Sequence, residues 1–118
     1  RKMTTPEGYI KAAVNKVIAK FKAVYKFMPV PYGYGTSSLD YLLCVVGRFI
    51  AIETKAPGKK PTRRQNMVIE QIERAGGKVF VIDSTEGAKE LEAYLEKLIN
   101  DTRTGEQQVQ VGGGAGAE

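Results

Sequence analysis

The chain has 118 residues, a formal net charge of +5 and 42% apolar residues, as expected for one globular domain with a modest core. It contains no histidine and one cysteine, which excludes histidine-based catalytic triads, histidine-ligated zinc and structural zinc. Any catalysis must therefore use carboxylates, Lys, Arg, Tyr or Ser/Thr, and any metal should prefer oxygen ligands, as Mg²⁺ and Mn²⁺ do.

The single cysteine, Cys44, lies in the apolar run 42–46 and has no partner for an internal disulfide. The apolar neighbours predict a buried core thiol. No apolar run approaches the roughly 18 residues that a membrane-spanning helix needs, and no signal-peptide pattern is visible. These features predict a cytoplasmic location.

The first helix is predicted to start in the segment 4–7, Thr-Thr-Pro-Glu, with a threonine N-cap, proline in the first helical position and Glu7 in the first turn. Apolar residues at helical spacing from position 10 to 21 continue it to about residues 21–23. The β-rich segment 24–30 predicts a first strand, which prolines at its end stop.

Glycine, proline and serine make the segment 31–38 a loop. Residues 39–46 and 48–55 then predict two strands joined by a tight turn at Gly47. A second loop, 56–61, is strongly basic.

The segment 62–65, Thr-Arg-Arg-Gln, matches a capping box and begins a second helix, which the pair Gly76-Gly77 ends. One face of this helix is predicted to carry Gln65, Val68 or Ile69, Ile72 and Ala75. Residues 78–83 predict a short apolar strand, and a last helix should run from Ser84 or Thr85 to about Asn100.

The resulting order α-β-β-β-α-β-α predicts an α/β fold, with a mixed four-stranded sheet and flanking helices. The strand-helix-strand unit 48–83 should form a right-handed crossover between parallel strands. We expect one domain over residues 1–100, followed by a Gln- and Gly-rich tail, 101–118, of disordered character.

Charge is distributed unevenly along the chain. The first 69 residues hold thirteen Lys and Arg but only three acids, Glu7, Asp40 and Glu53, which gives 13 − 3 = +10. The other 49 residues hold five basic and ten acidic groups, or −5. A surface cleared of carboxylates suits a polyanion such as nucleic acid, so the three remaining acids need a specific reason.

The hairpin geometry supplies that reason. A two-residue turn at Val46-Gly47 places Asp40 directly opposite Glu53, and a three-residue turn still leaves them neighbours. Like charges opposed in a sheet are destabilising, by about 3 kcal/mol at ~5 Å and an effective dielectric of ~20. Lys55 shares the strand face of Glu53, because side chains alternate with period two. The pattern therefore predicts two carboxylates around a cation, with an ammonium beside them.

This set suits metal-assisted phosphodiester hydrolysis. Asp40 and Glu53 would hold Mg²⁺, with Mn²⁺ as a substitute and the backbone carbonyl of Thr54 as a further ligand, and the metal would activate a bound water. Lys55 would orient or help to deprotonate that water. Glu7 would add a ligand or an outer hydrogen bond, or would simply favour the helix dipole.

Other residues are candidates for contacts with nucleic acid. Four cations within six residues, beside the site and at a helix N-terminus, suit phosphate binding, although a solvated loop has the same composition: Lys59, Lys60, Arg63 and Arg64. Two loop tyrosines, Tyr32 and Tyr34, would stack on a splayed base or pack the loop. Gln65 has two compatible roles, in the helix cap and in the catalytic set.

The chain resembles the VRR-Nuc branch of the PD-(D/E)xK nucleases over roughly residues 6–84. The resemblance rests on Gly35 and Asp40, the hairpin, Glu53-Thr54-Lys55, the basic loop, Arg64-Gln65 and Ala75-Gly76-Gly77. Glu-x-Lys alone is weak, but the combination is specific. Where the family usually has proline before the aspartate, this chain has Leu39, which puts the shape of the loop in question rather than the activity.

The resemblance implies a Mg²⁺-dependent endonuclease with a restriction-endonuclease-like α-β-β-β-α-β core. It assigns the family's catalytic Asp, Glu and Lys to Asp40, Glu53 and Lys55, its helix Gln to Gln65 and its first-helix Glu to Glu7. Stand-alone members of this size are similar to phage or bacterial junction-resolving enzymes, which act as homodimers. The expected location is then the bacterial or phage-infected cytoplasm.

Three functions remain open from the sequence. The first is a homodimeric endonuclease that cuts branched DNA such as Holliday junctions. The second is a site-specific, homing-type nuclease of the same fold, which would need base-edge contacts in a groove. The third is a catalytically silent nucleic-acid-binding module, against which the complete Asp40, Glu53 and Lys55 set argues.

Overall fold

The computed structural model describes residues 5–30 and 38–113, with side chains up to residue 103. Seven elements follow in the predicted order: α1 (Pro6–Ile18), β1 (Val24–Phe27), β2 (Tyr41–Val45), β3 (Arg48–Thr54), α2 (Arg63–Arg74), β4 (Lys78–Ile82) and α3 (Thr85–Gly113). The predicted α/β class with a mixed four-stranded sheet is confirmed.

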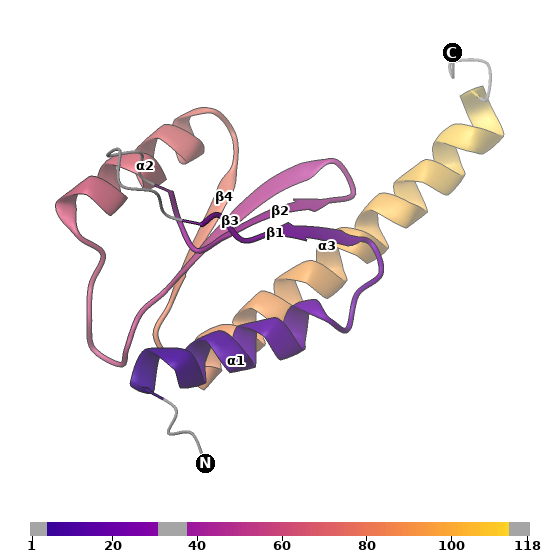
Figure 1. Cartoon of the computed structure of the whole chain (residues 1–118). Helices are drawn as coiled ribbons and strands as arrows, with labels where there is room; N and C mark the ends of the chain where they lie inside the picture. The colour runs from indigo at the N-terminus through magenta and orange to yellow at the C-terminus, as the bar shows by residue number, and fades with distance from the viewer. Residues whose placement is uncertain (1–4, 31–37, 114–118) are drawn as a thin grey trace.

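The sheet has the order β1-β2-β3-β4. β1 and β2 pair antiparallel, as do β2 and β3, whereas β4 lies parallel to β3 after the crossover through α2 (Figure 1). The β2–β3 register pairs Tyr41 with Ile52 and Val45 with Arg48. This is the register that a two-residue turn predicts, and Val46 and Gly47 adopt the positive φ angles, 44° and 86°, that such a turn needs.

One face of the sheet forms the core. α1 and α3 lie side by side across this face (Figure 1). The buried residues come from these two helices and from alternate positions of the strands, and they include Ile10, Val14, Tyr41, Leu43, Val45, Ile50, Ile52, Ile82, Leu91 and Leu95. The core therefore fixes α1 against the strands that carry the predicted acids.

Among the described residues, α2 is the helix that covers the opposite face, and none of its twelve residues is buried. Its predicted face is turned only partly inward: Ile72 is half-buried and Ala75 is exposed. On the same side of the sheet Tyr25, Cys44 and Phe49 are neighbours across three strands, and all three are exposed.

The prediction that Cys44 is a buried core thiol is wrong, because its side chain is exposed. Cys44 alternates with the buried Leu43 and Val45 and so points to the face on which α2 lies. An apolar strand in an antiparallel sheet does not need to be buried on both faces.

The helix termini follow the predicted signals at most ends. Thr5 caps α1, and the capping box of α2 is present, with Thr62 accepting from the backbone of Gln65 while the Gln65 side chain accepts from the backbone of Thr62. At its end, Gly77 N–H donates to the Ile72 carbonyl and Gly76 adopts φ 98°, as in a Schellman motif.

Two helix ends differ from the prediction. α1 ends at Ile18, earlier than residues 21–23, and α3 continues to Gly113, past the expected end at Asn100. The segment 101–104 contains no proline or glycine that would stop a helix. Among the residues that the structure describes, no helix combines the length and apolar character that a membrane span requires.

Candidate functional site

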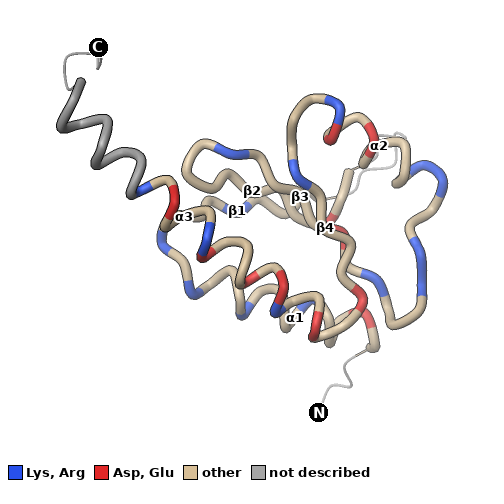
Figure 2. The backbone as a smooth tube through the Cα atoms, turned by 180° about the vertical axis from the view of Figure 1, so that it is seen from behind, with Lys and Arg blue, Asp and Glu red and all other residues tan. Residues whose placement is uncertain are grey.

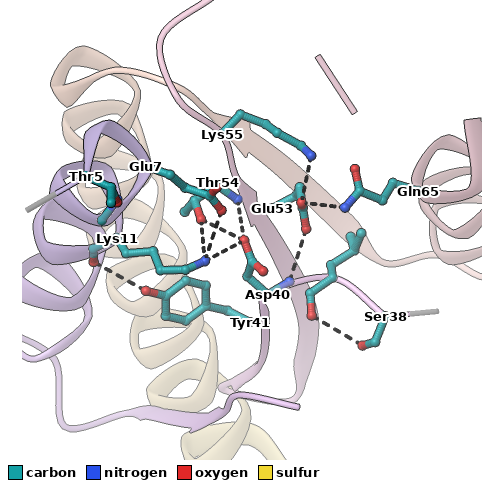
Figure 3. A network of polar contacts seen from close by, with 12 residues as sticks. Thr5, Glu7, Lys11, Ser38, Asp40, Tyr41, Glu53, Thr54, Lys55 and Gln65 are labelled. Carbon is teal, nitrogen blue, oxygen red and sulfur yellow. Dashed lines mark hydrogen bonds and ion pairs between the residues drawn. The ribbon is translucent and has the colours of Figure 1, made fainter. Parts of the chain in front are cut away.

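The fold brings Asp40 and Glu53 together at the ends of two neighbouring strands. Asp40 directly precedes β2, one step beyond the Tyr41–Ile52 pair, and Glu53 lies near the end of β3. The backbone N–H of Asp40 donates to Glu53 Oε1 at 3.2 Å (Figure 3). The predicted juxtaposition of the two carboxylates is therefore present.

Glu53 is almost completely buried, with 2% of its surface exposed. Its Oε2 accepts a hydrogen bond from Gln65 Nε2 at 2.8 Å and lies 3.4 Å from Lys55 Nζ. Burial raises the pKa of Glu53, the negative charge of Asp40 raises it further, and the opposing effect of Lys55 is smaller. The structure thus joins three predicted site residues, Glu53, Lys55 and Gln65.

Asp40 has a different environment, in which one oxygen is strongly hydrogen-bonded. Its Oδ2 accepts from the backbone N–H of Thr54 at 2.9 Å and from the Thr54 hydroxyl at 2.6 Å, and it pairs with Lys11 Nζ at 3.1 Å. Burial alone would raise the pKa of Asp40, but the Thr54 hydrogen bonds and the Lys11 ammonium outweigh it, and the pKa is lowered.

The pKa values of the two carboxyl groups are therefore shifted in opposite directions. Asp40 keeps its charge to lower pH than usual, while Glu53 takes up a proton more readily. Adjacent acids with separated pKa values are characteristic of functional sites, because a purely structural sheet gains nothing from a buried carboxylate pair.

Lys11 belongs to this site, although the sequence pattern assigns it no role. Its Nζ lies 3.3 Å from Glu7 Oε2 and 3.0 Å from Thr54 Oγ1, in addition to its contact with Asp40. Glu7 itself is half-exposed and is linked to Asp40 through Lys11. The only sequence signal was the i,i+4 spacing of Glu7 and Lys11 on one helix, which is common on solvated surfaces.

The buried phenol of Tyr41 fixes the backbone at Lys11. Its hydroxyl donates to the Lys11 carbonyl at 3.3 Å. Burial raises the pKa of Tyr41 to about 12, with a contribution from the charge of Asp40, so the phenol remains protonated and available as a donor. This contact ties the middle of α1 to the start of β2.

The predicted phosphate-binding cations lie on the surface, in the segment that joins β3 to α2 and in the first turn of that helix. Lys59, Lys60, Arg63 and Arg64 are all exposed, and none forms an ion pair with a carboxylate in the described part of the chain. Figure 2 shows this positive segment leading from β3 into α2, whereas the acids of α3 lie on the other side of the sheet. Tyr32 and Tyr34 lie outside the described residues.

Asp40 and Glu53 are compatible with a hard divalent cation. Within residues 5–30 and 38–103 no group of three His, Cys, Asp or Glu side chains is gathered closely enough to hold a metal alone. Mg²⁺ does not require such a group, because it often takes one or two carboxylates and completes its shell with water and substrate phosphate. Oδ1 of Asp40 has no protein partner among the described residues and is open to such an ion.

The contact between Gln65 and Glu53 gives a pH-dependent prediction. Gln65→Glu keeps a residue that completes the capping box but places a second carboxylate against Glu53. We expect the free energy of unfolding of the metal-free protein to fall by about 1–3 kcal/mol at pH 8. The loss should shrink as the pH falls through the raised pKa of Glu53, because a protonated Glu53 no longer repels the new carboxylate.

Urea unfolding at several pH values measures this effect. Thr62→Ala, which breaks the same helix cap without adding charge, serves as the control and should lose a similar amount at every pH. A Gln65→Glu loss that does not change with pH would contradict the assigned contact.

Comparison with known proteins agrees with this geometry at the level of the fold. No family model matches the sequence, and no curated protein matches it. A solved structure described as a VRR_NUC domain is similar to this chain, with a TM-score of 0.62 and 24% sequence identity, over 75% of this chain and 95% of that one. The resemblance predicted from the sequence is thus confirmed in three dimensions: the chain has the fold of a VRR_NUC domain.

Proposed function

We propose that this protein is a metal-dependent endonuclease of the VRR-Nuc type that hydrolyses phosphodiester bonds in DNA. The observation that carries the proposal is the opposed pair Asp40 and Glu53, in which the Asp40 backbone N–H donates to Glu53 Oε1 at 3.2 Å. Lys55 Nζ lies 3.4 Å from Oε2 of the same glutamate. The nuclease fold of the similar structure supports it.

In this proposal each side chain has a distinct task. Asp40 and Glu53 hold Mg²⁺ or Mn²⁺, with the Thr54 carbonyl and Glu7 as additional ligands. The ion supplies Lewis-acid stabilisation of a phosphate oxygen and a water of lowered pKa. Lys55 orients the attacking water, and Gln65 fixes the carboxylate of Glu53 through its 2.8 Å hydrogen bond.

The exposed cations supply the binding surface for the DNA backbone. Lys59 and Lys60 precede α2, and Arg63 and Arg64 open it, in a first turn that contains no acidic residue. A helix N-terminus surrounded by cations attracts phosphates, and such contacts make affinity strongly dependent on salt. Gln65, in the same first turn of α2, contacts Glu53, so this helix end links the cations to the carboxylate pair.

In this proposal the preferred substrate is branched DNA, and the active species is a homodimer. A four-way junction needs two opposed cuts, and two sites related by a two-fold axis provide them. Exposed aromatic residues on the α2 side of the sheet support self-association, because Tyr25 and Phe27 expose 68% and 52% of their surface on the same face as Phe49.

The first test is cleavage of labelled four-way junction, flap, single-stranded and linear duplex DNA with Mg²⁺, with Mn²⁺ and with chelator. Lys55→Ala should lower the metal-dependent rate by about 10²–10⁴-fold, as expected for a group that handles the water proton. Lys89→Ala, which removes an exposed lysine of α3 that has no predicted role in the site, should cleave as the wild type does. Light scattering on the same samples gives the mass of the active species.

The outcomes separate the candidate functions. Paired, metal-dependent nicks near the branch by a dimer support the junction-resolving nuclease. Equal cutting of junction and linear duplex, or a monomer with intact junction cutting, contradicts that specificity. A defined cut on long duplex DNA indicates a site-specific enzyme, and salt-sensitive binding without metal-dependent cleavage indicates a binding module.

A further inference from the structure

The ammonium group of Lys11 occupies a pocket of oxygens contributed by three elements. Glu7 Oε2 from α1 lies at 3.3 Å, Asp40 Oδ2 before β2 at 3.1 Å and Thr54 Oγ1 from β3 at 3.0 Å (Figure 3). An ammonium has three N–H donors, and these three acceptors use all of them. The position therefore resembles a small cation site built from oxygen ligands.

Two of the three oxygens around Lys11 belong to carboxylates that are proposed metal ligands. Asp40 is the central acid of the proposed metal site, and Glu7 is a further proposed ligand. A lysine ammonium and a divalent cation repel each other, so both cannot share the same two carboxylates at contact distance. Binding of a metal by Glu7 and Asp40 thus requires Lys11 to move.

The side chain of Lys11 is able to make this movement. Its backbone is fixed, since the carbonyl accepts from the Tyr41 phenol and the neighbouring Ile10 is buried. The side chain, however, is 33% exposed and carries the ammonium on a flexible four-carbon stem. The ammonium can leave the oxygens for solvent, or for a bound phosphate, without moving α1.

We propose that the Lys11 ammonium is a built-in cation that holds Glu7 and Asp40 together in the metal-free protein. When a divalent ion binds, it displaces this ammonium. The proposal rests on the proposed function, because it assumes that Asp40 is a metal ligand. Lys11 then acts as a positioning residue: it keeps the acids from repelling each other before a metal binds. It also lowers the affinity for metal, because its charge competes with the ion for the same two carboxylates.

The test is calorimetric titration of Mn²⁺ into the metal-free protein in the absence of DNA. Lys11→Met, which removes the charge but keeps most of the stem, should bind Mn²⁺ about tenfold more tightly than the wild type. Lys16→Met is the matched control, because it makes the same substitution at an exposed position of the same helix. The Mn²⁺ affinity of Lys16→Met should stay within about twofold of the wild type. This small difference measures the general effect of removing one positive charge.

Thermal unfolding gives a second readout. Without metal, Lys11→Met should unfold at a lower temperature than the wild type, since Glu7 and Asp40 lose their shared cation. With saturating Mn²⁺ its increase in Tm should exceed that of the wild type. If Lys11→Met does not fold, Lys11→Gln keeps a hydrogen-bond donor without the charge and gives the same comparison.

Unchanged or weaker Mn²⁺ binding by the Lys11 variants, in a wild type that binds Mn²⁺ and cleaves DNA, would overturn this inference alone. Absence of Mn²⁺ binding in every variant, together with absence of cleavage, would overturn the proposed function as well. Tight binding that appears only in Lys11→Met would support the inference most directly.

Discussion

Asp40→Asn is expected to lower metal-dependent DNA cleavage by more than about a hundredfold. Loss of an outer partner of a metal ligand already costs about 10–100-fold in affinity or activity, and Asp40 is a proposed direct ligand. The amide retains a carbonyl oxygen that can accept the hydrogen bonds of Thr54 N–H and hydroxyl, so the hairpin should keep its structure. Activity should therefore be lost without loss of folding.

The cleavage rate with saturating Mg²⁺, together with circular dichroism and urea unfolding of the same preparations, checks this prediction. Asp101→Asn makes the same chemical change on the exposed surface of α3, where Asp101 pairs with Lys97, and should cleave normally. An active Asp40→Asn protein would remove Asp40 from the catalytic set and with it the central support for a nuclease.

The placement of Asp40 and Glu53 could be predicted because it depends on local geometry. A two-residue turn fixes the register of a hairpin, and the alternation of strand residues then assigns each side chain to a face. The turn at Val46-Gly47 therefore determined, from sequence alone, which acids meet and that Lys55 joins them. The capping box of α2 is equally local, which is why Gln65 was placed correctly at the first turn.

The part played by α1 could not be predicted in the same way. Whether Lys11 contacts solvent or Asp40 depends on how α1 docks on the sheet, and this is set by packing among residues distant in sequence. The role of the Thr54 hydroxyl could not be predicted for a related reason. A threonine is an ordinary strand residue by propensity, and its second role appears only once its partners Asp40 and Lys11 are placed.

The exposed face of the sheet shows a further limit of pattern analysis. Cys44 lies in an unbroken apolar run, which is also the pattern of a strand buried on both faces. The run contains no polar residue on either face, so alternation gives no information on which face is covered. Only the arrangement of helices shows that α2 leaves Cys44 exposed.

Thr54→Val is expected to lower the free energy of unfolding of the metal-free protein by about 1–3 kcal/mol at neutral pH. Thr54 is fully buried, and its hydroxyl donates to Asp40 at 2.6 Å while accepting from Lys11 at 3.0 Å. Valine fills nearly the same volume without the hydroxyl, so Asp40 keeps only the backbone N–H and the ammonium as donors. Cleavage should also fall, because the orientation of the proposed metal ligand is lost.

The pH dependence of this loss identifies its cause. The lowered pKa of Asp40 contributes stability above its ordinary value of 3.8, and that contribution is lost as the pH falls through the folded-state pKa. Thr54→Val removes a hydrogen bond to the charged form and so raises the pKa of Asp40 toward 3.8. The stability difference from wild type should then be largest above pH 5 and narrow below about pH 4.

Thr54→Ser provides the control, since it keeps the hydroxyl and loses only a methyl group, at a cost of about 1 kcal/mol that does not vary with pH. Equal pH profiles for the serine and valine variants would mean that the hydroxyl, which serine keeps, does not account for the pH dependence. If the stability difference from the wild type becomes smaller at low pH only for the valine variant, the hydroxyl of Thr54 holds Asp40 in its charged form. This is the form that a divalent metal needs.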